Sequence, residues 1–398
     1  MAVKPPSFSV PPRECGRDIL PSVRYAPDPR EGTTPLQKGL LRLLGVPRLA
    51  RPPDLRGARI LAVQVAGMGD LLLAVPALRA LKAAFPGARL DLLTSARAAR
   101  AAQGCPYLDS ILSLEARGFQ GNQSPLRWRE AIPLIRRVRR AGYGLALNLI
   151  GLYTPQGAVR MGLFLRSLGV PLLAGRDTLG TGTFLHLALE ENLEAPINER
   201  DSNLALVRLL GAEDPQGGRL EAWPTSEEER RAEEMARSLP GEGPLVGVNP
   251  GSDRPEKAWP ESSFRQVMEA LRRERGARFV LTGGPAESDL TARLAGAVGE
   301  GALDTVGRIS FHGTAALLRR LDLFLTTDTA ALHLAWAAGA PAVALFRTEN
   351  LGRYRPATER IACLTGPEDG QGALRIGAGE VLRACRAQLD RAARKPGA

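Results

Sequence analysis

Apolar and polar positions alternate in blocks along the first half of the chain. Residues 60–65 form an apolar run of strand length, and a turn through two glycines follows it. Residues 70–87 then place apolar side chains at helical spacing and stop at a Pro-Gly pair, and residues 88–95 form the next apolar run. A strand, a helix and a strand in so short a stretch indicate a βαβ unit and therefore a parallel sheet.

A second series of strands and helices begins after residue 244. Ahead of it, residues 221–244 indicate a linker and then a helix, which Thr225 or Ser226 can cap and whose first turn is rich in acids. The strand-and-loop segments 245–252 and 277–287 each lead into a helix, so the chain repeats the pattern of its first half. The other predicted elements are a strand at 144–150, helices at 125–142, 202–212, 260–276, 290–299 and 379–395, and a helix, strand, turn, helix and strand within 313–346.

Length and patterning together divide the chain into four parts. A chain of 398 residues fits two domains at roughly 100–200 residues each. Residues 1–57, rich in Pro, Arg and Gly, predict a largely irregular extension with one helix at 36–45. The two series of strands and helices occupy residues 58–220 and 221–376, and residues 377–398 hold a last helix. The predicted fold class is therefore α/β with parallel sheets.

The charge of the chain is strongly basic, with a formal net charge of +11. Between residues 97 and 140, Arg residues far outnumber the acids Asp109, Glu115 and Glu130. Such a field suits an anionic partner, either nucleic acid, an acidic lipid surface or a phosphorylated small molecule, although solvated helix faces of an arginine-rich chain would look the same. Aromatic residues make up only 5% and no known nucleic-acid module is present, so no nucleic-acid partner is expected.

Cysteine usage and the N-terminus predict a location. The four cysteines lie far apart without metal-ligand spacing or the density of a disulfide scaffold, which favours a reducing cytoplasm. The first residues lack the apolar core of a secretory signal, and no charge-free apolar run reaches the roughly 18–20 residues that span a bilayer. We therefore expect a soluble, cytoplasmic protein that can touch a membrane surface.

Four loops of the second half follow predicted strands, where open parallel sheets bind their ligands. Pro-Gly-Ser and Gly-Gly-Pro turns bring chain and ligand close, Lys257 offers a point charge for a diphosphate, and Glu287 can accept hydrogen bonds from sugar hydroxyls. The helix start near Thr329 offers free backbone N–H groups. The candidate donor-binding residues are Gly251, Ser252, Lys257, Gly283, Gly284, Glu287, Ile309, Asp328, Thr329, Ala330 and His333.

Taken singly, residues of these loops can also be explained without a ligand. Asp328 or Thr327 alone could be only the cap of the following helix, and Lys257 alone could be a solvated surface lysine. Together the four loops could hold a nucleoside diphosphate sugar, with its base in an apolar slot near Ile309. Neither the GxGxxG fingerprint nor the P-loop sequence is present.

The first half offers one loop of interest, residues 65–72, with the sequence VAGMGDLL. Gly67 and Gly69 form its turn, and Asp70 stands at the carboxyl end of the first predicted strand. A carboxylate there suits a general base that takes a proton from an attacking hydroxyl. It equally suits a residue that only caps the following helix. Gly67, Gly69 and Asp70 are the candidate site residues of the first half.

Blocks 60–95, 246–264, 279–287 and 322–346 together resemble glycosyltransferase family 9, the ADP-heptose:lipopolysaccharide heptosyltransferases. The resemblance implies the GT-B fold, with two Rossmann-like domains facing across a cleft and the last helix, residues 377–398, returning to the first domain. Residues 58–220 would then hold the acceptor and residues 221–376 the nucleotide donor. It further implies an inverting, metal-independent transfer without a cofactor, from an ADP-sugar such as ADP-heptose to a lipopolysaccharide core or similar glycolipid acceptor.

The resemblance also implies roles for single residues. Asp70 maps onto the catalytic base, Lys257 onto the lysine that contacts the phosphates, and Glu287 onto a donor-binding acid. The family's donor loop, with the pattern Asp-Thr-Gly-x-x-His, maps onto Asp328, Thr329, Ala330 and His333. Three departures stand out, namely Ala330 in place of Gly, Gln64 in place of a basic residue, and FRTE at residues 346–349, where Arg347 and Glu349 would alter the rim of the donor cleft.

Two alternatives to transfer remain open at this point. The departures are compatible with a catalytically silent relative that binds a nucleotide or a glycan, and the fold would also suit a sugar-nucleotide epimerase. Candidates for contact with the acceptor or with an anionic membrane surface are Arg97, Arg100, Arg127 and Arg129. The sequence does not determine the oligomeric state.

Overall fold

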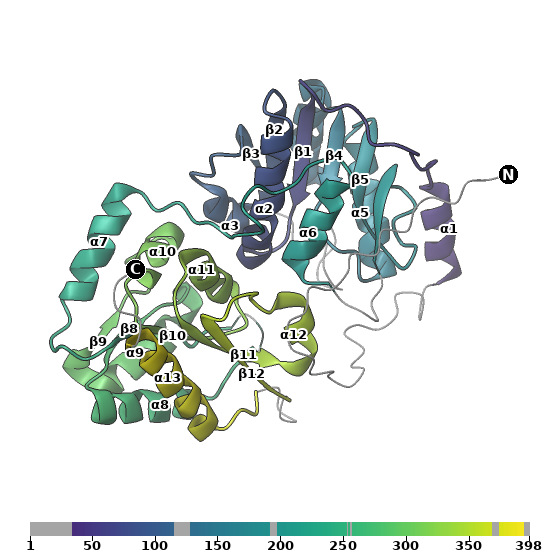
Figure 1. Ribbon diagram of the computed structural model, residues 1–398. Helices are drawn as coiled ribbons and strands as arrows, with labels where there is room; N and C mark the ends of the chain where they lie inside the picture. Colours follow the sequence, from purple (N-terminus) through teal and green to yellow (C-terminus); the bar gives the residue numbers. More distant parts are fainter. Residues whose placement is uncertain are drawn as a thin grey trace.

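The computed structural model describes residues 34–114, 128–191, 197–252, 254, 257–367 and 374–393, without the side chains of residues 128–130. Within these residues the chain forms two units, each built on a six-stranded parallel sheet (Figure 1). The first sheet has the order β3-β2-β1-β4-β5-β6, and the second has the order β12-β11-β10-β7-β8-β9. The prediction of an α/β fold with parallel sheets is therefore confirmed.

Strands of the first sheet appear where short apolar runs were expected, at β1, β2 and β4. Three further strands, β3, β5 and β6, lacked a strong enough pattern to be predicted. The bounds are β1 (Arg59–Gln64), β2 (Arg89–Ser95), β3 (Ser110–Leu114), β4 (Leu145–Asn148), β5 (Leu172–Thr178) and β6 (Leu187–Glu191).

Helices cover both faces of this sheet. The helices α1, α4 and α5 bury apolar side chains against one face, and α2, α3 and α6 do so against the other. The extension thus contributes a helix, α1, that packs on α5 at the outer side of the unit (Figure 1). The bounds are α1 (Pro35–Leu43), α2 (Met68–Ala84), α3 (Ala96–Ala99), α4 (Trp128–Ala141), α5 (Pro155–Ser167) and α6 (Glu199–Arg208).

The second unit repeats the architecture after the linker. Its strands are β7 (Leu245–Asn249), β8 (Arg278–Leu281), β9 (Ala302–Asp304), β10 (Leu323–Thr327), β11 (Ala342–Arg347) and β12 (Ile361–Gly366). Its helices are α7 (Ser226–Arg237), α8 (Glu261–Arg275), α9 (Ser288–Val298), α10 (Phe311–Leu318), α11 (Ala330–Ala338), α12 (Thr348–Tyr354) and α13 (Ala378–Ala393). None of the helices in the described ranges is long and apolar enough to cross a bilayer.

The last helix corrects one expectation, that residues 377–398 return to the first domain. Helix α13 packs against α8 and against strands β10 to β12 of the second sheet. Val381, Cys385 and Leu389 recur at four-residue intervals and are buried in the core of that unit. Arg386 also pairs with Glu274 of α8 at 2.7 Å. The apolar stripe of α13 is therefore buried against the second unit.

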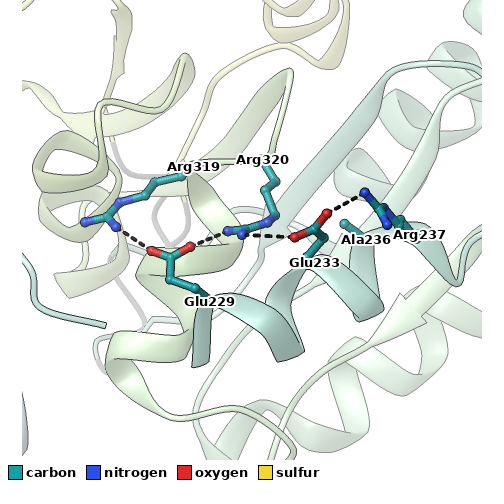
Figure 2. Close-up of a pocket in the computed structure, with 6 residues that line it drawn as sticks. All are labelled: Glu229, Glu233, Ala236, Arg237, Arg319 and Arg320. Carbon is teal, nitrogen blue, oxygen red and sulfur yellow. Dashed lines mark hydrogen bonds and ion pairs between the residues drawn. The ribbon is translucent and has the colours of Figure 1, made fainter. Parts of the chain in front are cut away.

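Thr225, one of the two residues that the sequence offered as a cap, is the N-cap of helix α7. The Thr225 hydroxyl accepts from the backbone N–H of Glu228, and the Glu228 carboxylate accepts from the N–H of Thr225. Beyond the cap, a chain of ion pairs joins α7 to the end of α10, in which Glu229 lies between Arg319 and Arg320 (Figure 2). These side chains are partly exposed, so each pair adds little stability, but together they fix where α7 lies.

Candidate active site

A cavity of about 1320 Å³ lies between the two units. Its wall is made by loops at the carboxyl ends of β1, β7, β8 and β10, as expected for parallel sheets. The residues that the sequence put forward for the donor site, and the three of the loop before α2, all line this one cavity. They are Gly67, Gly69, Asp70, Gly251, Ser252, Lys257, Gly283, Gly284, Glu287, Ile309, Asp328, Thr329, Ala330 and His333.

Asp70 is the third residue of α2, the helix that follows the loop at the carboxyl end of β1. Its Oδ2 accepts a hydrogen bond from the backbone N–H of Gly67 at 3.1 Å, so it does cap the helix, from within the first turn. Burial and the negative charge of Glu199 raise the pKa of Asp70 to about 6, against the opposing effect of the Gly67 N–H and of Lys257. A carboxyl group with that pKa can accept a proton near neutral pH.

Lys257 and Asp328 form an ion pair on the donor side. Lys257 Nζ donates to Asp328 Oδ2 at 2.7 Å and to the backbone carbonyl of Asp328 at 3.2 Å. The same Oδ2 accepts from Asn350 Nδ2 at 3.1 Å. Lys257 is only 16% exposed, so it is not a solvated surface lysine, and Asp328 orients it rather than capping α11.

The start of α11 provides further groups next to this ion pair. Thr329 is the N-cap residue, and its side chain makes no capping hydrogen bond. Its buried Oγ1 has no hydrogen-bond partner among the described residues. Ala330 does not adopt a positive φ, so the position does not need the glycine that the family resemblance implies. Free N–H groups beside a lysine make this corner suited to an anion.

Glu287 lies over two glycine turns. Its Oε2 accepts from the backbone N–H of Gly284 at 2.7 Å, which fixes the carboxylate at the cavity wall. A Cβ added to Gly251 would lie 2.4 Å from Glu287 Cγ, so only glycine fits there. The PGS and GGP turns are therefore needed for the close approach of the Glu287 side chain.

His333 connects the donor loop to the first unit. Burial is the main reason that its pKa falls to about 4, so the imidazole is neutral near pH 7. A Cβ added to Gly69 would lie 2.8 Å from His333 Cδ2 and 3.3 Å from Ala330 Cα. Gly69 thus allows the first turn of α2, which carries Asp70, to contact α11 directly.

A group of residues that the sequence analysis missed lies beside Asp70. Tyr153 Oη donates to Glu199 Oε1 at 2.5 Å, and Arg176 Nη2 donates to Tyr153 Oη at 2.6 Å. Arg353 of α12 places its guanidinium 3.7 Å from the centroid of the Tyr153 ring. Arg176 also pairs with Glu191 at 2.7 Å. The one signal in the sequence was an arginine, Arg176, inside an otherwise buried strand.

Helix α12 begins within the FRTE segment, at Thr348, and brings three residues to the cavity. Asn350, Arg353 and Tyr354 line it, whereas Arg347 and Glu349, which we expected at the rim, lie 3.3 Å apart in an ion pair outside the lining. Burial and the negative charges of Asp70 and Glu199 raise the pKa of Tyr354 well above its usual value.

The remaining candidates divide between the cavity and the parts not described. Arg97 and Arg100 line the cavity on the side of the first unit. Arg127 and the side chain of Arg129 lie outside the described residues. Gln64 is buried, and its Oε1 accepts from the N–H of Ala66 at 3.2 Å, which holds the loop before Gly67. Among the residues that the structure describes, no group of three or more His, Cys, Asp or Glu could hold a metal ion.

Comparison with known proteins places the chain in a family. A sequence model of glycosyltransferase family 9 (heptosyltransferase) matches residues 133–375. Lipopolysaccharide heptosyltransferase 3 of Escherichia coli K12 is 27% identical over 305 residues, which cover 74% of this chain and 83% of that protein.

Solved structures share the fold. Glycosyl transferase family 9 from Veillonella parvula DSM 2008 superposes with a TM-score of 0.70 at 20% identity, covering 85% of this chain and 99% of that one. The E. coli heptosyltransferase WaaC with ADP has a TM-score of 0.62 at 20% identity, covering 83% and 99%. The GT-B fold that the resemblance implied is thereby confirmed. With a family match over more than half of its length and a two-sheet fold to go with it, the chain is a glycosyltransferase and belongs to glycosyltransferase family 9 (heptosyltransferase).

Proposed function

We propose that this enzyme moves a heptose, or a related sugar, from an ADP-sugar to a lipopolysaccharide core or a similar glycolipid acceptor. The observation that carries the proposal is that Asp70 of the first unit and the Lys257–Asp328 pair of the second line one cavity. The curated relatives are named as lipopolysaccharide heptosyltransferases, and the WaaC structure holds ADP, which supports an ADP-sugar donor. The site of action is the cytoplasmic side of a membrane.

The donor side is suited to stabilise a leaving nucleoside diphosphate. Lys257 is held by Asp328 at 2.7 Å, and the first turn of α11 directs its N–H groups to the same region. Charge that builds up on the departing phosphate would meet groups already in place, which is the largest source of rate enhancement in many enzymes. Glu287 is placed to accept hydrogen bonds from sugar hydroxyls.

The acceptor side supplies the base. Asp70 removes the proton of the acceptor hydroxyl as its oxygen attacks the anomeric carbon of the sugar. A new carbon–oxygen bond forms while the bond from that carbon to the diphosphate oxygen breaks, and ADP leaves with the electron pair. A single displacement of this kind inverts the anomeric configuration, and it needs no metal ion if Lys257 and α11 stabilise the phosphates.

Arg97 and Arg100 extend the cavity wall on the acceptor side. Core glycolipids carry carboxylate and phosphate groups, so two arginines in the same cavity as Asp70 suit such an acceptor. The cavity therefore combines a binding surface for an anionic donor with one for an anionic acceptor. This agrees with the positive net charge of the chain.

The test is a transfer assay with ADP-heptose and heptose-deficient lipopolysaccharide in detergent. We expect release of ADP and a mass increase of the acceptor, with inversion seen by NMR of the product. Asp70→Asn is expected to lower kcat about 10²–10⁴-fold while ADP still binds. Turnover close to that of the wild type in Asp70→Asn would refute the role of the base.

Two other outcomes would point to the alternatives. Binding of ADP without turnover towards any core acceptor would indicate a silent relative. Conversion of the sugar nucleotide to an isomer in the absence of acceptor would indicate an epimerase. Membership of a glycosyltransferase family supports transfer over both.

A further inference from the structure

Within the described residues, exposed large apolar side chains gather on one layer of helices. On α1, Leu36 and Leu43 are 73% and 79% exposed, and Leu49, just after this helix, is 38% exposed. On the neighbouring helices of the same layer, Ile132 of α4 is 42% exposed and Leu163 of α5 is 40% exposed. These five residues, together with helices α1, α4 and α5, are called the α1–α4–α5 face.

Helix α1 packs firmly on the first unit although its Leu36 and Leu43 are exposed. Leu41 and Leu44, on the adjacent side of the helix, are buried in the core with α5. The backbone carbonyl of Leu41 also accepts from Thr183 Oγ1 at 2.5 Å, which fixes the end of α1. Leu36 and Leu43 are seven residues apart and so lie on one stripe, directed away from the contact with α5. The helix is therefore firmly docked and still presents an apolar edge.

Positive charge surrounds this apolar edge. Helices α1 and α5 contain no acidic residue, and α4 contains only Glu130. Burial and the positive charges of Arg166 and Arg48 lower the pKa of His186, which lies under the same face. The basic residues of the three helices whose side chains the structure describes are Lys38, Arg42, Arg136, Arg137, Arg139, Arg140, Arg160 and Arg166.

From this arrangement we propose that the α1–α4–α5 face docks the enzyme on an anionic lipid bilayer. Leu36, Leu43 and Leu163 enter the headgroup region, and the surrounding arginines contact lipid phosphates. A basic surface alone would also suit nucleic acid, but exposed leucines next to the charges favour a lipid surface, which can take up both. The proposal deepens the proposed function, on which it rests, because a glycolipid acceptor is itself anchored in a membrane.

The test measures binding of the full chain to vesicles by flotation, without donor or acceptor. We expect binding to vesicles of phosphatidylcholine mixed with phosphatidylglycerol, weakening as salt is added, and little binding to phosphatidylcholine alone. The double variant Leu36→Ser/Leu43→Ser is expected to bind at least about tenfold more weakly. Arg136→Gln/Arg137→Gln/Arg140→Gln is expected to bind the mixed vesicles about tenfold or more weakly as well.

Matched controls separate this face from general hydrophobicity and charge. Ile197 is 50% exposed but precedes α6 on the other side of the first sheet, so Ile197→Ser should bind like the wild type. Arg237→Gln/Arg265→Gln/Arg273→Gln removes three exposed charges from the second unit and should also leave binding unchanged.

Several results would overturn the inference. These are absence of wild-type binding to anionic vesicles, equal binding by the leucine variant, or a dimer in analytical ultracentrifugation that the leucine variant abolishes while no vesicle binding is seen. None of them bears on sugar transfer in detergent, so failure of this inference and failure of the proposed function can be told apart.

Discussion

Arg353 of α12 lies 3.7 Å from the centroid of the Tyr153 ring, and its Nε lies 3.5 Å from Glu199 Oε1. A helix of the second unit is thereby joined to the first unit next to the proposed base. On the same helix, Asn350 contacts Asp328, which orients Lys257. Helix α12 thus connects the base side of the cavity with the phosphate side.

The pH dependence of transfer should respond to Glu199. Its negative charge helps to raise the pKa of Asp70 to about 6, and the base works only when deprotonated. Glu199→Gln should therefore move the acid limb of the kcat/KM profile to lower pH, by up to about one unit. Glu191→Gln is the control, because Glu191 pairs with Arg176 but, unlike Glu199, is not one of the leading influences on the pKa of Asp70. An acid limb that stays in place in Glu199→Gln would contradict the coupling.

The raised pKa of Asp70 also predicts a dependence of stability on pH. The folded protein binds the Asp70 proton more tightly than the unfolded chain, whose carboxyl has a pKa near 3.8. The stabilising contribution of this group is therefore complete below about pH 4 and is lost as the pH rises through about 6. Asp70→Asn keeps the residue neutral, so it should raise Tm at pH 8, with a difference that narrows towards pH 4. Differential scanning fluorimetry across this pH range measures it, and a constant difference would speak against the ionisation.

Lys257 should control the affinity for ADP. Replacing it by Met removes the positive charge that lies 2.7 Å from Asp328 Oδ2. The buried Asp328 carboxylate then lacks its cationic partner and repels the diphosphate, which weakens ADP binding further. We expect ADP binding in calorimetry to weaken at least about tenfold, and kcat to fall as well. Lys82→Met is a matched control, since Lys82 pairs with Asp109 at 2.9 Å outside the cavity. Unchanged ADP affinity in Lys257→Met would remove Lys257 from the donor site.

Gly69 should tolerate no side chain. The Cβ of Gly69→Ala would lie 2.8 Å from His333 Cδ2, and the backbone of Ala330 closes the other side, so the α2 and α11 ends must move apart. We expect a loss of about 1–3 kcal/mol in the free energy of unfolding and a fall in kcat. In Gly144→Ala the new methyl group meets nothing within 4 Å, so denaturant unfolding of the two variants compares a crowded with an open position. Equal stability of both would show that the units do not rely on this contact.

The residues of the cavity that the sequence predicted share one property. They follow strands whose apolar runs are easy to find, and the rule that parallel sheets bind ligands at their carboxyl ends brings such loops together. Asp70 and Lys257 were found in this way. The structure adds that Asp70 caps its helix and lines the cavity as well, so the two interpretations of that residue were not exclusive.

The residues that were missed depend on tertiary placement. Tyr153 and Glu199 are separated along the chain and meet only because β4, β5 and α6 lie side by side, and Arg353 reaches them from the other unit. No local pattern predicts such a contact. The last helix lies elsewhere than the family resemblance implies, because Val381, Cys385 and Leu389 are buried in the core of the second unit.

Helix α12 has only seven residues, too few to stay helical without outside support. Its contacts come from both units, through Asn350 on one side and Arg353 on the other. A fluctuation that separates the units would therefore melt this segment long before either sheet opens. The amide protons of residues 348–354 consequently act as a built-in reporter, whose exchange with solvent deuterium registers how often the two halves of the enzyme come apart.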